Sequence, residues 1–283
     1  MSALANLDVL DLVLLIACLL LLGCVSGYLA GLLGVGGGIV LVPGLHFIFE
    51  SLSEKFGFST ENLMHVCIGT SLAIIVPTGW SSARAHHKRG GVDLDIVKRL
   101  GLGIVIGVVL ATAVAKDLSG TSLKMIFATA ILFLSFLMIA DHEKFKLGNE
   151  LPKQPVTGLA GFVIGVLSAL IGIGGATLSV PYMSMYGVPI RRAVGSASAM
   201  GLVISIPAAI GYIYIGLGQE GLPPFSLGYV NFLAWLCVIP SSMLMAPFGA
   251  KTAHNVSVKR LKIIFSVFMM IVALNMWRKI LMP

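Results

Sequence analysis

The sequence predicts an all-α integral membrane protein made of two inverted-topology repeats, each with five transmembrane segments and a glycine-rich, re-entrant hairpin. Three observations support this prediction: the composition, long runs without charge, and an internal repeat. Of the 283 residues, 57% are hydrophobic and only 11% are charged, whereas soluble domains carry roughly 25% charged residues. So few charges cannot cover a water-facing surface, and we expect the bilayer to be the solvent.

Long segments of the chain contain no Asp, Glu, Lys or Arg. They cover 12–49, 62–83, 154–190, 193–219, 221–250 and 263–277. A spanning helix needs about 20 mostly apolar residues, and backbone groups in lipid must be satisfied within their own element. The first eleven residues contain Asp8 and Asp11 but no basic residue, unlike a signal peptide. We therefore expect the first apolar stretch to be the first membrane helix.

The two halves of the chain carry the same motifs in the same order. Residues 27–43 match residues 165–181 at an offset of 138, and four glycines and the final proline of the first copy have identical partners in the second. A second block, 69–73, resembles 195–199, and a third, 123–127, matches 261–265. Three blocks in order indicate an internal repeat. The predicted organisation is a first half 1–140, a cytoplasmic linker 141–153 and a second half 154–283.

Each half divides into five apolar segments. They are expected near 12–33, 38–50, 62–83, 98–115 and 121–140, and near 155–172, 175–189, 193–216, 226–249 and 260–279. Basic residues concentrate in cytoplasmic loops, and placing both termini outside puts fourteen of the nineteen Lys and Arg inside. Five segments per half then invert the second half relative to the first, as in many secondary transporters.

Each half contains a glycine turn followed by a short apolar arm. After Gly38 only about a dozen uncharged residues remain, and the run 154–190 has the same shape. At 1.5 Å per residue such an arm covers roughly 18 Å, against a hydrocarbon core of about 30 Å. We expect each turn to lie at membrane depth and to start a half-helix. Entering from opposite sides, the two tips should approach each other near the midplane.

These turns predict a binding site for a small oxyanion. A helix start presents free N–H groups and a partial positive charge, and glycine leaves those groups accessible. Apart from Glu50, at the end of the second segment, no acidic residue lies in the predicted spans. The predicted binding residues are Gly36, Gly37, Gly38, Thr70, Ser71, Gly174, Gly175, Ala176, Ser196 and Ser198. The alternative is that the small residues only allow close helix packing. A nucleotide loop is rejected because no strand precedes the glycines and no Lys-Ser/Thr follows them.

A basic cluster at 84–89 ends the third apolar segment. We interpret this cluster as a signal for membrane orientation, with side chains that extend toward the aqueous surface. The alternative is that Arg84 and His87 form a vestibule that attracts anions. His65 is interpreted as a hydrogen-bonded packing residue, with a proton carrier as the alternative. The four cysteines are scattered without metal-ligand spacing, so neither a metal nor a cofactor is predicted.

Taken together, the motifs resemble the TauE/SafE family of sulfite and organosulfonate exporters. The resemblance rests on 34–43, 69–73 and the stretch from His86 to Asp93 in the first half, and on 172–181 and 226–231 in the second. It spans nearly the whole chain and implies export of sulfite or a short sulfonate, coupled to an ion gradient, with protons as a candidate. Ala176 replaces the third glycine of the first hairpin, so the two tips need not contribute equally.

The expected function is therefore a secondary transporter for a small anion in the bacterial inner membrane, with substrate and lipid bilayer as partners. The alternative is an uptake permease or a channel for another small anion or solute. An intramembrane enzyme is disfavoured, because the spans hold no clustered carboxylates and no Ser/His/Asp set. The net charge is +7. The basic residues lie in short loops between the apolar segments, so membrane topology explains this charge and nucleic-acid binding is not predicted. The sequence leaves the oligomeric state open, a homo-oligomer included.

Overall fold

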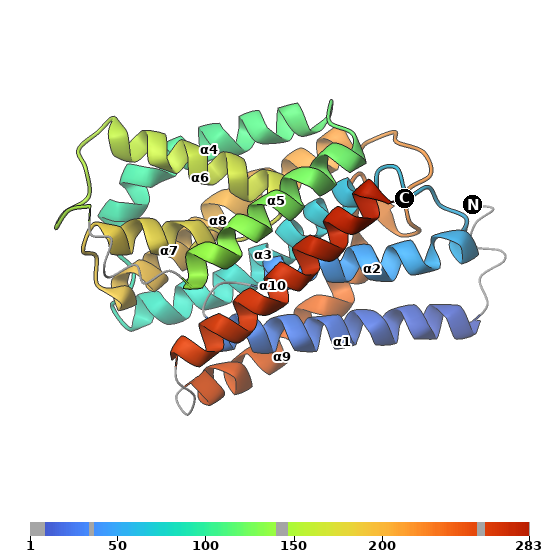
Figure 1. Ribbon diagram of the computed structural model, residues 1–283, viewed down its shortest axis with the longest axis horizontal. Coiled ribbons are helices and arrows are strands. Elements are labelled where there is room, and N and C mark those ends of the chain that lie inside the picture. Colours follow the sequence, from blue (N-terminus) through green and yellow to red (C-terminus); the bar gives the residue numbers. More distant parts are fainter. Residues whose placement is uncertain (1–8, 34–36, 140–146, 254–257, 283) are drawn as a thin grey trace.

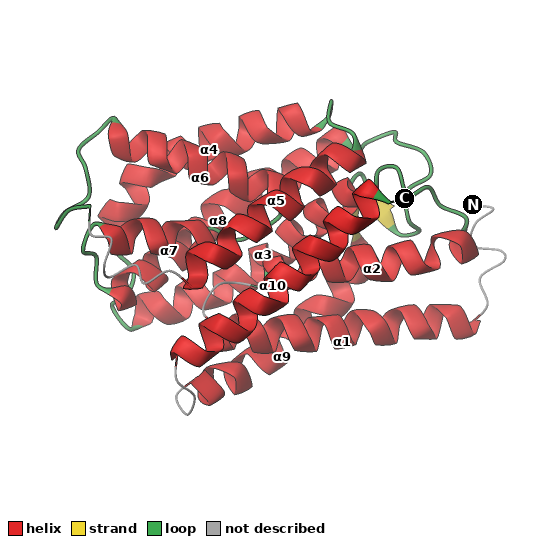
Figure 2. Cartoon of the chain, viewed as in Figure 1, coloured by secondary structure: helices red, strands yellow, loops and turns green. Residues whose placement is uncertain are grey.

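A computed structural model describes residues 9–33, 37–139, 147–253 and 258–282, and most of them are helical (Figure 2). The helices are α1 Val9–Leu33, α2 Gly38–Phe56, α3 Leu63–Lys88, α4 Leu94–Ala115, α5 Gly120–Ile139, α6 Val156–Ile171, α7 Ala176–Met185, α8 Ile190–Ile215, α9 Phe232–Ala253 and α10 Val258–Leu281. Two short strands, β1 Ser226–Leu227 and β2 Val230–Asn231, pair antiparallel. The predicted helical class is confirmed. The ninth apolar segment was expected to begin near residue 226. Residues 226–231 instead form this hairpin, and α9 begins at Phe232.

Seven of the described helices are long and apolar enough to cross a membrane. They are α1, α3, α4, α5, α8, α9 and α10. Their outward faces carry large apolar side chains, such as Leu21, Leu102 and Ile264, each more than half exposed. Apolar surface of this extent is suited to lipid rather than to water. The chain is a multi-pass membrane protein.

The second arm of the first hairpin is longer than predicted. The sequence suggested a half-helix over 38–50, but α2 has 19 residues, or about 28 Å. Beyond Glu50 the helix becomes amphipathic: Leu52 and Phe56 are buried while Lys55 is exposed. It ends at Gly57, whose φ of 65° suits a left-handed helix cap. Of the two hairpin arms that were predicted to be half-helices, only α7 is one: it has 10 residues, or about 15 Å.

The two hairpins extend toward opposite ends of the molecule. In Figure 1, α1 and α2 extend toward the end where the N and C marks lie, whereas α7 lies at the other end. The helices of the two halves are interleaved, since α1 packs on α9, α4 on α6, α3 on α8 and α5 on α10. The core is therefore shared by both halves.

Two glycines of the repeated motif allow this close packing. A Cβ on Gly27 of α1 would lie 2.2 Å from the carbonyl oxygen of Ser242 in α9. A Cβ on Gly165, the equivalent position in α6, would lie 2.4 Å from the carbonyl oxygen of Ile104 in α4. Only glycine permits backbones to approach this closely, as in other small-residue contacts between membrane helices. For these two positions the packing interpretation is correct.

Candidate functional site

The tips of the two hairpins meet inside the molecule. Gly37 is the N-cap of α2 and Gly175 the N-cap of α7. The next residue of α2, Gly38, is so close to the other tip that a Cβ would lie 2.7 Å from the carbonyl oxygen of Gly172. The same carbonyl accepts a hydrogen bond of 2.7 Å from the hydroxyl of Ser71 in α3. Two helix starts are thus held side by side by backbone contact.

A cavity of about 550 Å³ lies beside these tips. Its deep end is formed by buried residues, among them Leu41, Ile74 and Gly175. Its other end is formed by exposed residues, among them Ser82, Ala85 and Arg89 near the end of α3. The volume falls within the roughly 300–1,000 Å³ of typical ligand pockets. The cavity therefore runs from one end of the molecule to the two helix starts.

The polar groups of the cavity are mostly small and neutral. Ser82 donates a hydrogen bond of 3.2 Å to the hydroxyl of Ser198 on α8, which itself donates to the carbonyl of Val194 at 3.0 Å. Because Gly37 and Gly175 lack side chains, they offer no capping acceptor to the first N–H groups of α2 and α7. Arg89 adds a positive charge, and none of the described residues that line the cavity is acidic. The N–H groups at the two helix starts and the charge of Arg89 favour an anion over a cation.

Five of the predicted site residues line the cavity: Gly37, Gly174, Gly175, Ala176 and Ser198. Gly36 lies outside the described residues. The structure places the other four predicted residues, Gly38, Thr70, Ser71 and Ser196, outside the lining.

Those four residues instead join segments that are distant in the sequence. Gly38 and Ser71 contact Gly172, as described above. The hydroxyl of Thr70 accepts the N–H of Asn231 at 2.8 Å, which anchors β2 on α3. The hydroxyl of Ser196 accepts the N–H of Asp93 at 2.9 Å, and the Asp93 carboxylate pairs with Arg192 at 2.5 Å. In the structure, these hydroxyls therefore form hydrogen bonds with backbone groups of other segments.

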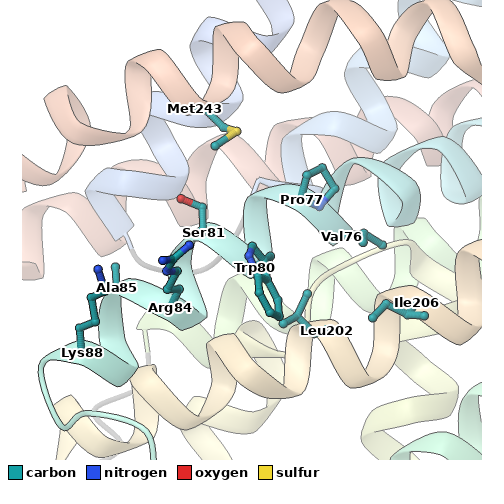
Figure 3. A pocket seen from close by; sticks show the side chains of 10 residues that line it. All are labelled: Val76, Pro77, Trp80, Ser81, Arg84, Ala85, Lys88, Leu202, Ile206 and Met243. Carbon is teal, nitrogen blue, oxygen red and sulfur yellow. The ribbon is translucent and has the colours of Figure 1, made fainter.

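The basic cluster does contribute to the cavity mouth, but not through Arg84 and His87, the two residues that the sequence suggested. Arg84 lies in a separate groove on the outside of α3 (Figure 3), and His87 is exposed without lining the cavity. His86 and Arg89 line it instead. Helical spacing accounts for this, because residues three and four apart share a face: Thr78, Ser82, His86 and Arg89 follow that spacing. This pattern in the sequence could have identified them.

His65 has a packing role in the structure. Its Nε2 lies 3.0 Å from the carbonyl oxygen of Ala115 at the end of α4. Its ring stacks on Tyr229 with centroids 4.7 Å apart. These contacts join α3, α4 and the loop before α9, as the packing interpretation of this histidine expected.

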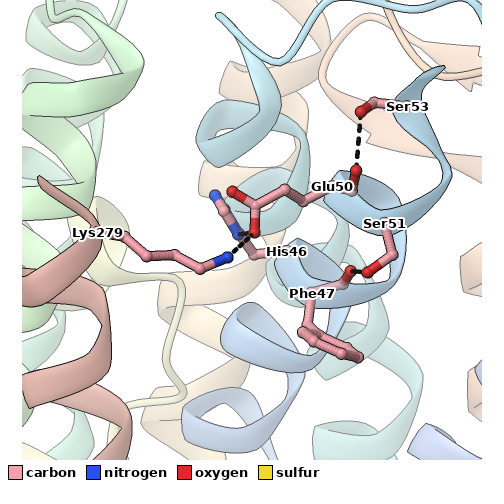
Figure 4. Close-up of polar contacts among 6 residues, drawn as sticks. All are labelled: His46, Phe47, Glu50, Ser51, Ser53 and Lys279. Carbon is pink, nitrogen blue, oxygen red and sulfur yellow. Dashed lines mark hydrogen bonds and ion pairs between the residues drawn. The ribbon is translucent and has the colours of Figure 1, made fainter. Parts of the chain in front are cut away.

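A second cluster of polar residues was missed by the sequence analysis. His46 and Glu50 lie one turn apart on α2, with the His46 Nδ1 3.6 Å from a carboxylate oxygen of Glu50 (Figure 4). That oxygen also lies 2.5 Å from the Nζ of Lys279 on α10. Lys124 of α5 and Asn275 of α10 line the same cavity of about 340 Å³. The spacing of His46 and Glu50 was visible in the sequence, but their partners were not.

The fold and the cavity together define a class: a helical membrane transporter. Residues 19–276 match the family described as sulfite exporter TauE/SafE. The chain therefore belongs to the TauE/SafE family.

Three similar proteins match this chain over nearly all of their own length. A probable membrane transporter protein of Haemophilus influenzae is 32% identical over 260 residues, which is 92% of this chain and 97% of that protein. A probable membrane transporter protein of Methanocaldococcus jannaschii is 26% identical over 94% of this chain and 97% of its own length. The probable membrane transporter protein YunE of Bacillus subtilis is 27% identical over 90% and 94%. The similarity thus covers both halves of the chain, and the names of these relatives specify no substrate.

Proposed function

We propose that this chain is a secondary transporter that exports a small sulfur oxyanion, sulfite or a short organosulfonate, across the bacterial inner membrane. The main support for this proposal is the cavity beside the starts of α2 and α7, because none of its described lining residues is acidic. Sulfite and sulfonates present three oxygens, which suit N–H and O–H donors at a helix start. Neutral donors also favour release, because buried arginines would hold a dianion more tightly.

The position of the cavity mouth supports export. His86 and Arg89 lie at the end of α3 that the distribution of basic residues assigns to the cytoplasm. A cavity that is accessible from this side collects substrate from the cytoplasm. Arg89 would attract the anion toward the mouth, and the helix starts would bind it deeper inside.

The arrangement of helix pairs supports the inverted repeat. If α1–α5 are exchanged with α6–α10, the α1–α9 pair becomes α6–α4, and the α3–α8 and α5–α10 pairs become themselves. Any two-fold axis that relates the two halves produces this pattern, and an axis in the membrane plane also turns the second half upside down. The two hairpins extending toward opposite ends are consistent with the same axis (Figure 1).

A substrate panel tests the proposed function. We expect purified protein in liposomes to exchange labelled sulfite or a short sulfonate, and Arg89→Gln to raise the half-saturating concentration about five- to tenfold, the effect of losing roughly 1–1.4 kcal/mol. Arg99→Gln is the matched control, because Arg99 is also exposed at this end of the molecule but does not line the cavity. Exchange of a different solute class, with no response to sulfur oxyanions, would instead identify a permease or channel of other selectivity.

We also propose protons as the coupling ion, bound by His46 and Glu50. His46 is 7% exposed, and the groups that face the pair are Lys279 and Asn275 of α10 and Lys124 of α5. The other side of α2 lines the substrate cavity through Gly37 and Leu41. One helix therefore touches both sites, which gives a physical route for coupling them. Ionisable residues inside a membrane protein often serve such proton steps.

Glu50→Gln tests this assignment. We expect it to abolish accumulation driven by a pH gradient while exchange of substrate for substrate continues, because the amide cannot take up and release a proton. A sulfonate is the better substrate here, since it stays ionised and carries no proton itself. Glu54→Gln is the control, as Glu54 is exposed one turn further along α2. Gradient-driven accumulation that persists in Glu50→Gln would remove Glu50 from the coupling step.

A further inference from the structure

A groove of about 660 Å³ lies on the outer side of α3, separate from the substrate cavity. Figure 3 shows Trp80, Arg84 and Lys88 along α3, with Leu202 and Ile206 from α8 and Met243 from α9 around them. Trp80 is 62% exposed and Ile206 45% exposed. The groove is therefore open to the surroundings of the helices, where the fold places lipid.

The groove has an apolar part and a basic end. Pro77, Leu202, Ile206 and Met243 provide the apolar part. Trp80, Arg84 and Lys88 follow one another at intervals of four residues, which puts them on one face of α3 about 6 Å apart along its axis. Among the described residues, the side chains of Arg84 and Lys88 have no hydrogen-bond or ion-pair partner, and no acidic residue lines the groove. Two unpaired cations thus adjoin an apolar surface.

We propose that this groove binds an anionic phospholipid of the leaflet at this end of the molecule, which the basic residues assign to the cytoplasm. The phosphate contacts Arg84 and Lys88, and an acyl chain lies over Leu202, Ile206 and Met243. Basic pockets between membrane helices on the cytoplasmic side commonly bind anionic head groups. Trp80 lies between the two parts, at the level where tryptophan prefers the lipid–water interface.

The geometry favours a lipid over a second copy of this chain. A symmetric dimer through this groove would bring Arg84 and Lys88 of two copies close together, and like charges repel. A soluble anion would use the basic end and leave the apolar part uncovered. A phospholipid satisfies both parts at once.

The bound lipid would also border the substrate cavity. Ser81, Ala85 and Met243 line both the groove and the cavity. These residues form a thin partition between substrate and bilayer, and a lipid in the groove covers its outer side.

Native mass spectrometry of the purified full chain tests the proposal. With phosphatidylglycerol added to the detergent, we expect lipid adducts that phosphatidylcholine does not produce at the same concentration. The double variant Arg84→Gln/Lys88→Gln should bind phosphatidylglycerol about thirtyfold more weakly, since each basic residue near an anionic head group contributes roughly a factor of five. The double variant Lys98→Gln/Arg99→Gln, which removes two exposed cations of α4 at the same end, should bind like the wild type.

Two further measurements separate the alternatives. Leu202→Trp fills the apolar part and should weaken phosphatidylglycerol binding while both cations remain. Glycerol phosphate, the soluble head group alone, should not compete. Equal loss of binding in both double variants, competition by glycerol phosphate, or a dimer that Leu202→Trp dissociates would each overturn the assignment of this groove to a phospholipid.

Discussion

Gly201→Phe is expected to reduce transport at least tenfold while the protein remains folded. Gly201 is a buried residue of α8 that lines the substrate cavity, and a Cβ built on it meets no atom within 4 Å. A phenyl ring can therefore enter the cavity without displacing the backbone, and it occupies the space that the anion needs. The measurement is flux into liposomes, together with the elution profile and thermal unfolding of the purified variant.

Gly101→Phe is the matched control for this experiment. Gly101 lies in the middle of α4, also has no atom within 4 Å of an added Cβ, and does not line the cavity. Both variants replace a helical glycine and add the same apolar surface. If Gly201→Phe folds and transports as well as Gly101→Phe does, the substrate follows a different path through the molecule.

Gly38→Ala is expected to lower the free energy of unfolding by about 1–3 kcal/mol, the usual effect of overpacking. The added Cβ would lie 2.7 Å from the carbonyl oxygen of Gly172 and 2.9 Å from the Cα of Ile173. Both are backbone atoms of the opposite hairpin tip, so the tips would have to separate. Chemical or thermal unfolding in detergent measures the change.

The neighbouring substitution Gly37→Ala provides the comparison. Its Cβ would lie 3.4 Å from the Cβ and carbonyl oxygen of Ser26, a contact that needs little or no adjustment, so we expect stability close to that of the wild type. A Gly38→Ala variant that is as stable as Gly37→Ala would therefore show that the two tips are not tightly packed.

Much of the fold was predictable from the pattern of apolar residues. Each of the ten predicted segments corresponds to one described helix, because charge-free runs and glycine turns are local properties of the chain. The end of α2 was predicted wrongly, since Glu50 and Lys55 suggested an end at the membrane surface. In the structure, Glu50 pairs with Lys279 of α10 and Lys55 with Asp11 of α1. Partners from distant parts of the sequence allow the charged turns to stay helical.

The candidate site was predictable only in part, for a similar reason. The glycines at 37, 174 and 175 line the cavity because a turn at membrane depth leaves its backbone accessible. Thr70 and Ser196 belong to the same motifs, yet their hydroxyls bind the amides of Asn231 and Asp93. The sequence shows that a serine or threonine in an apolar helix can form a hydrogen bond. It does not show which group is the partner.

The sequence by itself determined that this is a membrane protein, that glycine-containing motifs recur in its two halves, and that glycine turns start two of its helices. Apolar periodicity and glycine act on the chain locally, so these features can be recognised without a structure. Only the tertiary structure decided which side chains face the cavity, because that depends on how α3 and α8 are rotated against the hairpins. That rotation is set by contacts between residues about 100 positions apart, such as Ser71 with Gly172 and Asp93 with Arg192.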